Sequence, residues 1–165
     1  MSLDHLIKEI NNNNLESAIS IIEKIGLDQD YKAVPILINY LVSTENNILR
    51  DTIAVALADI GSTEAIEPLI NLLKSPTTTK SRGTLLYALE SFDCSSYTEL
   101  IVDLLFEDGF EVSKQAFLLL EAQMPYISNE MKLKSIKRIN TKIKDHSQRR
   151  AFLEDCVDLF EENIE

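Results

Sequence analysis

A spacing of 32 residues between matching positions constrains the fold of this chain more than any other feature. Residues 48–75 supply the pattern, ILRDTIAVALADIGSTEAIEPLINLLKS, with apolar side chains at helical period over 48–60 and again over 65–73. Gly61 lies between the two stripes. Glycine takes the left-handed conformation that ends a helix without a steric penalty, so Gly61 predicts a turn. The stretch is therefore predicted to be a hairpin of two helices.

The same residue classes recur 32 positions upstream and downstream of this hairpin. Matching sets are Leu37, Leu69 and Ile101 in the first helix of each pair, and Arg50, Arg82 and Lys114, followed by Ile53, Leu85 and Phe117, in the second. One hairpin cannot bury both of its apolar stripes, whereas a row of stacked hairpins can. The period therefore predicts a solenoid of helix pairs.

The pattern predicts the bounds of five pairs. Expected helices span 2–10 and 15–25, 31–43 and 46–60, 63–75 and 79–92, 96–107 and 111–123, and 129–144 and 148–163. Gly26 is expected to end the second helix, Ser62 to cap the fifth, and Ser96 with Glu99 to form a capping box. We expect one domain over 1–165, with a degenerate N-terminal cap pair (1–26), three 32-residue repeats (31–123) and a divergent C-terminal cap pair (126–165).

The central repeat resembles a known family. The residues that carry the resemblance are Arg50, Ala54, Ala56, Leu57, Ile60-Gly61, Glu64-Ala65-Ile66, Pro68-Leu69-Ile70 and Leu72-Leu73. They are similar to the short HEAT-like repeat named after phycobilisome lyases, strongly over 31–92 and less so over 93–123, where Phe92-Asp93 replaces the glycine turn. The resemblance implies an all-α fold: a right-handed α-α superhelix (HEAT-like solenoid) of about five antiparallel helix pairs.

The composition and net charge indicate which classes of partner the chain can bind and in which compartment it is expected. The 165 residues carry a net charge of −11, which repels phosphate backbones and attracts basic proteins. No apolar run is long enough for a membrane span, and the first residues do not resemble a secretory signal. Cys94 and Cys156 are expected to be free thiols in a reducing compartment. We expect a cytoplasmic protein that binds neither nucleic acid nor membranes.

Charge is distributed unevenly near the C-terminus. Residues 131–150 hold eight basic side chains and one acidic one, while residues 151–165 hold six acidic side chains. The last two helices are therefore predicted to be antiparallel neighbours whose charges partly neutralise each other. The alternative is a nucleic-acid patch, which the acidity of the rest of the chain and the absence of Trp disfavour.

No catalytic, metal or cofactor site is predicted. The chain contains none of the HExxH, GxSxG, GxxxxGK[ST] or GxGxxG motifs, and His5 and His146 are too far apart to suggest a metal pair. Two enzyme classes share this repeat, the bilin lyases and the alkylpurine DNA glycosylases. No residue argues for bilin chemistry, and the glycosylases are basic with an aromatic-lined cleft, so both are lesser alternatives.

The resemblance places partner binding on the second helix of each pair, which lines the concave face of a HEAT solenoid. The predicted partner-binding residues are Asp51, Val55, Asp59, Leu86, Tyr87, Glu90, Gln115, Leu118 and Leu119. Tyr87 is the expected aromatic anchor of an apolar row, Val55–Tyr87–Leu119, with an acidic margin. The alternative is that the row packs between neighbouring helices.

These observations predict a non-enzymatic interaction module, an adaptor or scaffold, that binds a partner with a basic surface on its concave face. The alternative is an immunity-type inhibitor of a bacterial toxin, a role known for small HEAT-like proteins and consistent with the acidic charge. A toxin-like reading frame beside the gene would distinguish the two. The oligomeric state stays open.

Overall fold

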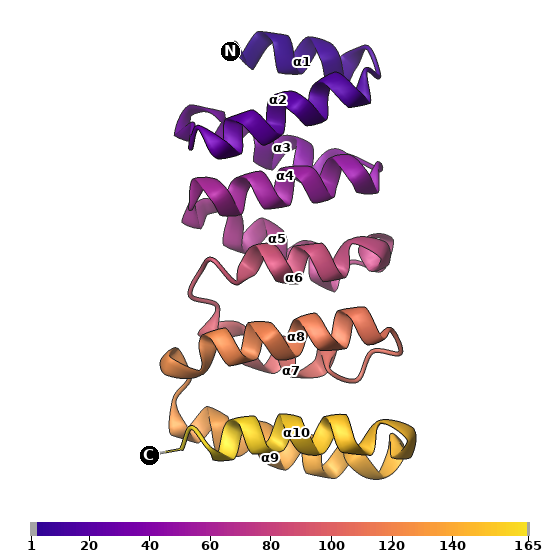
Figure 1. Ribbon diagram of the computed structural model, residues 1–165, viewed down its shortest axis with the longest axis vertical. Helices are drawn as coiled ribbons and strands as arrows, with labels where there is room; N and C mark the ends of the chain where they lie inside the picture. Colours follow the sequence, from indigo (N-terminus) through magenta and orange to yellow (C-terminus); the bar gives the residue numbers. More distant parts are fainter. Residues whose placement is uncertain (1–2, 165) are drawn as a thin grey trace. The chain divides into compact units, whose positions relative to one another are not determined.

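The chain is all-α. A computed structural model describes residues 3–164, which form α-helices joined by short 3-10 segments, with no strand in that range (Figure 1). The 3-10 segments are Tyr31–Ala33, Thr63–Ala65, Pro76–Ser81, Ser95–Tyr97, Met124–Tyr126, Ile143–Asp145 and Ser147–Arg149. The chain divides into two compact units, an N-terminal unit ending at Phe92 and a C-terminal unit beginning at Asp93.

The N-terminal unit stacks three helix pairs. Its helices are α1 (Leu3–Asn11), α2 (Leu15–Leu27), α3 (Val34–Ser43), α4 (Asn47–Ile60), α5 (Ile66–Lys74) and α6 (Arg82–Leu89). Helices α2, α4 and α6 lie side by side in one layer, and α3 and α5 lie behind them in a second (Figure 1). The predicted stack of hairpins is therefore confirmed in this unit. Residue 2, the expected start of the first helix, lies outside the described residues.

The C-terminal unit contains two further pairs. Its helices are α7 (Thr98–Leu104), α8 (Phe110–Gln123), α9 (Asn129–Lys142) and α10 (Arg150–Glu161). Helix α7 packs on α8, α9 packs on α10, and α7 also contacts α9 (Figure 1). The all-α solenoid of helix pairs is thus confirmed. No helix within residues 3–164 combines the length and the apolar character needed to cross a bilayer.

The repeated apolar columns form the core between the two layers. Leu37 and Leu69, which occupy one column of the first helices, are both 0% exposed. Ile53 and Leu85 occupy a column of the second helices and are also 0% exposed. Stacking removes these side chains from water, which is the main driving force for this fold.

One glycine behaves as predicted and another does not. Gly61 adopts φ +74° and its N–H donates to the carbonyl oxygens of Leu57 and Ala58, so it ends α4 as expected. Gly26 lies inside α2, which continues to Leu27, and is buried. The prediction that Gly26 ends the helix is wrong, because the left-handed residue after α2 is Gln29, with φ +50°.

Two predicted caps are also wrong. In the described structure Ser62 makes no side-chain cap hydrogen bond, because the chain enters α5 through the 3-10 turn Thr63–Ala65. The expected capping box at Ser96 and Glu99 is replaced by Asp93, whose Oδ1 accepts from the Ser95 N–H at 3.0 Å. Glu99 instead pairs with Lys134 on α9.

Candidate functional site

A groove opens on the face of the N-terminal unit formed by α2, α4 and α6. It has a volume of about 450 Å³. Its lining includes Glu23 and Leu27 from α2, Asp51, Val55 and Asp59 from α4, and Thr84 from α6. These six residues define the acidic groove. Three of the nine partner-binding residues predicted from the sequence are among them.

Helical spacing explains why the lining alternates in character. Asp51, Val55 and Asp59 are four residues apart in sequence, so their side chains follow one face of α4 as an acidic, an apolar and an acidic position. Glu23 and Leu27 have the same spacing on α2. At 1.5 Å per residue, the two carboxylates of α4 are about 12 Å apart along the helix axis.

Gly26 brings the two walls of the groove together. A Cβ atom at this position would lie 3.0 Å from the Cα atom of Ala56 and 3.3 Å from Oδ2 of Asp59. Only a residue without a side chain permits this approach of α2 to α4. Gln29, just after α2, adds a hydrogen bond from its Nε2 to the Asp59 carbonyl oxygen at 3.0 Å.

The charge of the acidic groove has one sign. Glu23, Asp51 and Asp59 contribute carboxylates, and no Lys, Arg or His belongs to the described lining. Glu23 and Asp59 are exposed and Asp51 is half-buried. Leu27 is 80% exposed, a large fraction for a leucine on a folded surface. The arrangement can attract a cation and bury an apolar side chain beside it.

Tyr87 lies just beyond the acidic groove. It follows Thr84 by three residues, so the two side chains share a face of α6. Its side chain is 54% exposed, and Glu90, partly exposed, follows at the C-cap of α6. The predicted aromatic anchor is therefore on the surface and available to a partner.

Two of the predicted surface residues are in the core instead. Leu86 and Leu119 are both 0% exposed, so the prediction that their side chains face outward is wrong. Leu86 precedes Tyr87 by one residue, which turns its side chain about 100° around α6 toward the interior. In α8 the outward position is Leu118, 37% exposed, because the repeat has shifted by one residue there.

The other two predicted residues lie on α8 of the C-terminal unit. Gln115 is half-buried, and Leu118 is exposed. Neither lines the acidic groove. Their role in partner binding stays a prediction.

Sequence reasoning missed the contribution of α2. Glu23 precedes Val55 by 32 residues, and Leu27 precedes Asp59 by the same interval. Extending the repeat by one unit toward the N-terminus would have found both. The surface row of this unit is therefore Glu23–Val55–Tyr87 rather than Val55–Tyr87–Leu119.

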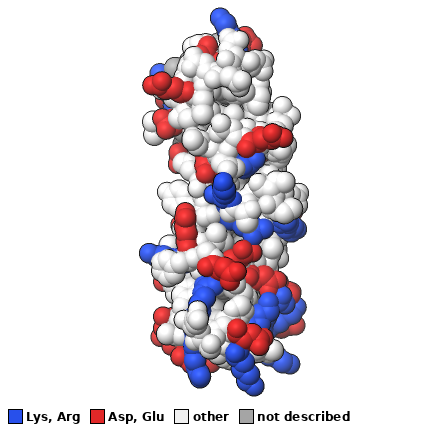
Figure 2. All heavy atoms as spheres, turned by 90° about the vertical axis from the view of Figure 1, so that its right-hand side faces the viewer, with Lys and Arg blue, Asp and Glu red and all other residues white. Residues whose placement is uncertain are grey.

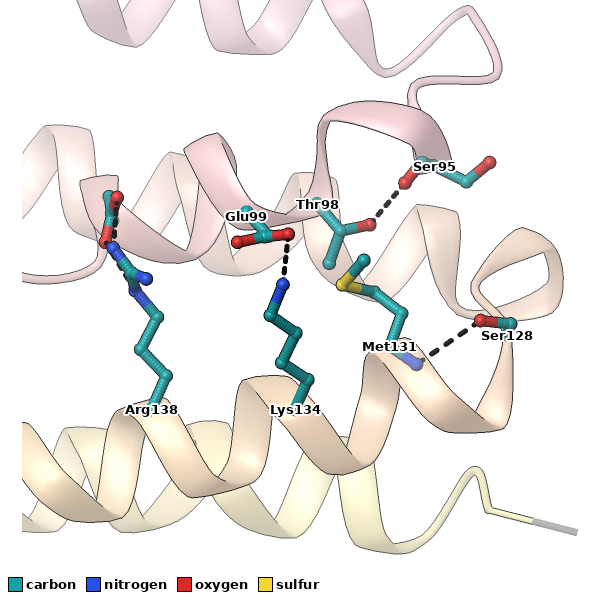
Figure 3. Close-up of polar contacts among 8 residues, drawn as sticks. Ser95, Thr98, Glu99, Ser128, Met131, Lys134 and Arg138 are labelled. Atoms are coloured by element: carbon teal, nitrogen blue, oxygen red, sulfur yellow. Dashed lines mark hydrogen bonds and ion pairs between the residues drawn. The ribbon is translucent and has the colours of Figure 1, made fainter.

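The basic helix near the C-terminus pairs with a different element from the one predicted. Lys134 and Arg138 of α9 reach the carboxylates of Glu99 and Asp103 on α7, at 2.6 and 2.5 Å (Figure 3). Helix α9 does pack against α10, as expected. Within residues 3–164, however, the direct ion pairs of α9 run to α7, so the partial neutralisation of α9 by α10 stays a prediction.

Comparisons with known proteins bear on the N-terminal unit. Residues 3–90, more than half of the chain, match the family model described as HEAT repeats. No curated protein matches the sequence. In the described part of the chain, no three side chains of His, Cys, Asp or Glu are grouped so that they could hold a metal ion.

Proposed function

We propose, from the premise that this chain belongs to the HEAT-repeat family, that it is a non-enzymatic protein-binding module. HEAT repeats generally mediate contacts between proteins. Here the acidic groove is the partner site, and the partner contributes a basic, amphipathic segment. The acidic groove supports this proposal because it combines three carboxylates with an exposed leucine on one layer of helices.

The spacing on α4 specifies the segment that fits best. Asp51 and Asp59 are about 12 Å apart along the helix, with Val55 between them. A partner helix lying along α4 matches them with basic residues about two turns apart and an apolar residue midway. Tyr87, on the neighbouring helix α6, would then contact the side of the segment that faces α6.

Apolar burial and charge have different roles in this site. Burying an exposed leucine side chain contributes about 1.5–3 kcal/mol, so Leu27 supplies affinity. The carboxylates at the rim attract a basic segment over a distance of about 8–10 Å and speed its association. Binding should consequently weaken as the salt concentration rises.

The test begins with capture of the partner from the source cell, using the full chain as bait. The affinity of the recovered partner is then measured for the parent and for Leu27→Ala, Glu23→Lys and Tyr87→Ala. Leu27→Ala and Glu23→Lys should each weaken binding about tenfold, which corresponds to about 1.4 kcal/mol. Tyr87→Ala should weaken binding in the same direction.

Two substitutions outside the acidic groove serve as matched controls. Glu45→Lys makes the same charge change in the exposed loop between α3 and α4, and Val42→Ala shortens an exposed apolar side chain on α3. Both should bind the partner as the parent does. A recovered partner whose affinity is the same for the groove variants and the parent would refute the proposed site.

A further inference from the structure

A second groove lies within the C-terminal unit, between α7 and α9. It has a volume of about 490 Å³, and its lining includes Glu99 and Val102 from α7 and Lys134, Lys137, Arg138 and Lys142 from α9. These six residues define the basic groove. Figure 3 shows the long side chains of Lys134 and Arg138 extending from α9 toward α7.

We propose that the basic groove is a separate binding site for an acidic peptide segment of another protein. It does not share a residue with the acidic groove, and its charge has the opposite sign. The chain would then hold two protein segments of opposite charge, one in each unit.

The cations in the basic groove outnumber the carboxylates that face them. Arg138 engages both carboxylate oxygens of Asp103, with Nη2 at 2.5 Å from Oδ1 and 2.6 Å from Oδ2. Lys134 is hydrogen-bonded to Glu99 at 2.6 Å. These two pairs account for both acids of α7 that face the groove. Lys137 and Lys142 remain as the surplus positive charge.

The surplus cations are accessible to a ligand. Lys137 is exposed and has no ionic partner in the described part of the chain. Lys142 lies 3.8 Å from Asp103, whose oxygens already bind Arg138 at shorter distances. Its Nζ also lies 4.5 Å from the centroid of the Phe106 ring, which positions it at one end of the groove. Lys137 and Lys142 both belong to the lining, so an acidic segment that lies along the groove meets both ammonium groups.

The composition of the basic groove favours a peptide over a nucleic acid. The methylene stems of the lysines form an apolar surface on which a peptide side chain can pack. No aromatic side chain belongs to the lining itself, and the Phe106 ring beside it already contacts Lys142 and stacks on His146, so bases have little aromatic surface on which to stack. The net charge of −11 also disfavours a long phosphate backbone more than a short acidic segment.

The binding experiment uses the full chain and a fluorescein-labelled peptide of ten glutamates, followed by fluorescence anisotropy at low salt. We expect saturable binding. Lys137→Gln should weaken it about threefold, as expected for one exposed charge pair, and the double variant Lys137→Gln with Lys142→Gln about tenfold. Circular dichroism of each variant checks that the helices are retained.

Matched controls separate a site from general attraction. Lys144→Gln removes the same charge from an exposed lysine of the same basic segment outside the groove lining, and should change the affinity less than twofold. Glu23→Lys, in the acidic groove, should retain the lysine dependence, so failure of the proposed function leaves this test intact. A single-stranded decathymidylate serves as the nucleic-acid probe.

Three results would overturn the proposal. One is the absence of saturable peptide binding to the folded parent. Another is an equal loss of affinity in Lys144→Gln, which would show diffuse attraction rather than a site. The third is tighter binding of decathymidylate with the same dependence on Lys137 and Lys142, which would assign the groove to nucleic acid.

Discussion

At the scale of single residues, Gly26 has the strongest effect on the candidate site. It is buried within α2, where the backbone of α4 approaches it at Ala56. A glycine inside a helix ordinarily costs about 1 kcal/mol relative to alanine, so its presence there needs a packing reason. The close approach of the two helices, which sets the width of the acidic groove, is that reason.

Gly26→Ala is therefore expected to destabilise the protein although alanine is the better helix former. Its Cβ would lie 3.0 Å from the Ala56 Cα atom, a backbone atom that cannot move aside cheaply. We expect a net loss of about 1–3 kcal/mol in the free energy of unfolding, measured by urea denaturation. Ser20→Ala, at an exposed position of the same helix, should be neutral or slightly stabilising. A more stable Gly26→Ala protein would contradict the described packing.

The two cysteines are expected to be unreactive in the folded protein. Cys94 and Cys156 are buried and are not joined in a disulfide, and burial raises the pKa of each thiol to about 12. The thiolate is the reactive form, so a disulfide reagent at pH 8 should modify both thiols only as the protein unfolds. Rapid modification of the native protein at a rate equal to that of the denatured chain would contradict their burial.

The same pKa shift makes stability depend on alkaline pH. The folded-state pKa of each thiol is raised above the unfolded value of about 8.5. The contribution of the neutral, buried thiols to stability is therefore fully present below about pH 8.5. The contribution is lost as pH rises from about 8.5 to 12. The urea midpoint of the parent should therefore fall as pH rises across that range. The urea midpoint of the double variant Cys94→Ala with Cys156→Ala should fall less over the same range.

At the scale of elements, α9 shows that charge pattern does not determine which helices form ion pairs. The sequence places a basic helix before an acidic one, yet the ion pairs of α9 in the described residues run to α7. Helix α10 contains one ion pair within itself, between Arg150 and Glu154, which are four residues apart in sequence and 2.8 Å apart in space. Its other acids are exposed, which leaves them in contact with water rather than with α9.

The Glu99–Lys134 pair gives a pH-dependent contribution to stability. The hydrogen bond from Lys134, followed by its charge, lowers the pKa of the Glu99 carboxyl group. A carboxyl group whose pKa is lowered in the folded state stabilises the fold at pH values above its unfolded-state pKa. This stabilisation is lost as pH falls through the folded-state pKa. Glu99→Gln should therefore lower the urea midpoint slightly at pH 7 and leave it unchanged near pH 3.

Glu45→Gln is the matched control for this prediction. Glu45 is an exposed glutamate in the loop between α3 and α4, outside any helix. Its substitution should not reproduce the pH-dependent difference from the parent. If the urea midpoint of Glu99→Gln differed from that of the parent by the same amount at pH 7 and near pH 3, the ion pair would not contribute to stability.

At the scale of the whole molecule, the two units differ in how much repeat structure they contain. The N-terminal unit stacks three pairs, and the match to HEAT repeats covers residues 3–90. The C-terminal unit has two pairs. Repeat proteins gain stability from the interfaces between neighbouring repeats, and about three repeats are needed for a stable fold.

We therefore expect residues 1–92 to fold without the remainder of the chain, and residues 93–165 to be markedly less stable in isolation. Circular dichroism and urea denaturation of the two fragments measure this. Fragment 1–92 should show helical spectra and a cooperative transition at a lower urea concentration than the full chain. A fragment 1–92 that is unfolded in buffer would show that the N-terminal unit depends on the rest of the protein.

The sequence by itself determined the helix pairs, their core columns and the turn at Gly61. These features follow from local chemistry that repeats: an apolar stripe at helical period buries one face, and glycine tolerates the left-handed conformation. The same reasoning placed Asp51, Val55 and Asp59 on one face of α4, where they line the acidic groove.

Only the tertiary structure decided how closely the helices approach one another and which side chains meet between them. The sequence predicts that Gly26 ends a helix. The structure shows instead that the missing side chain at Gly26 allows the close approach of Ala56. The outward side chain of α8 and the ionic partner of α9 likewise depend on neighbours distant in sequence. A local pattern specifies the face that a helix buries, whereas a groove exists only where the side chains of two or more helices leave space between them.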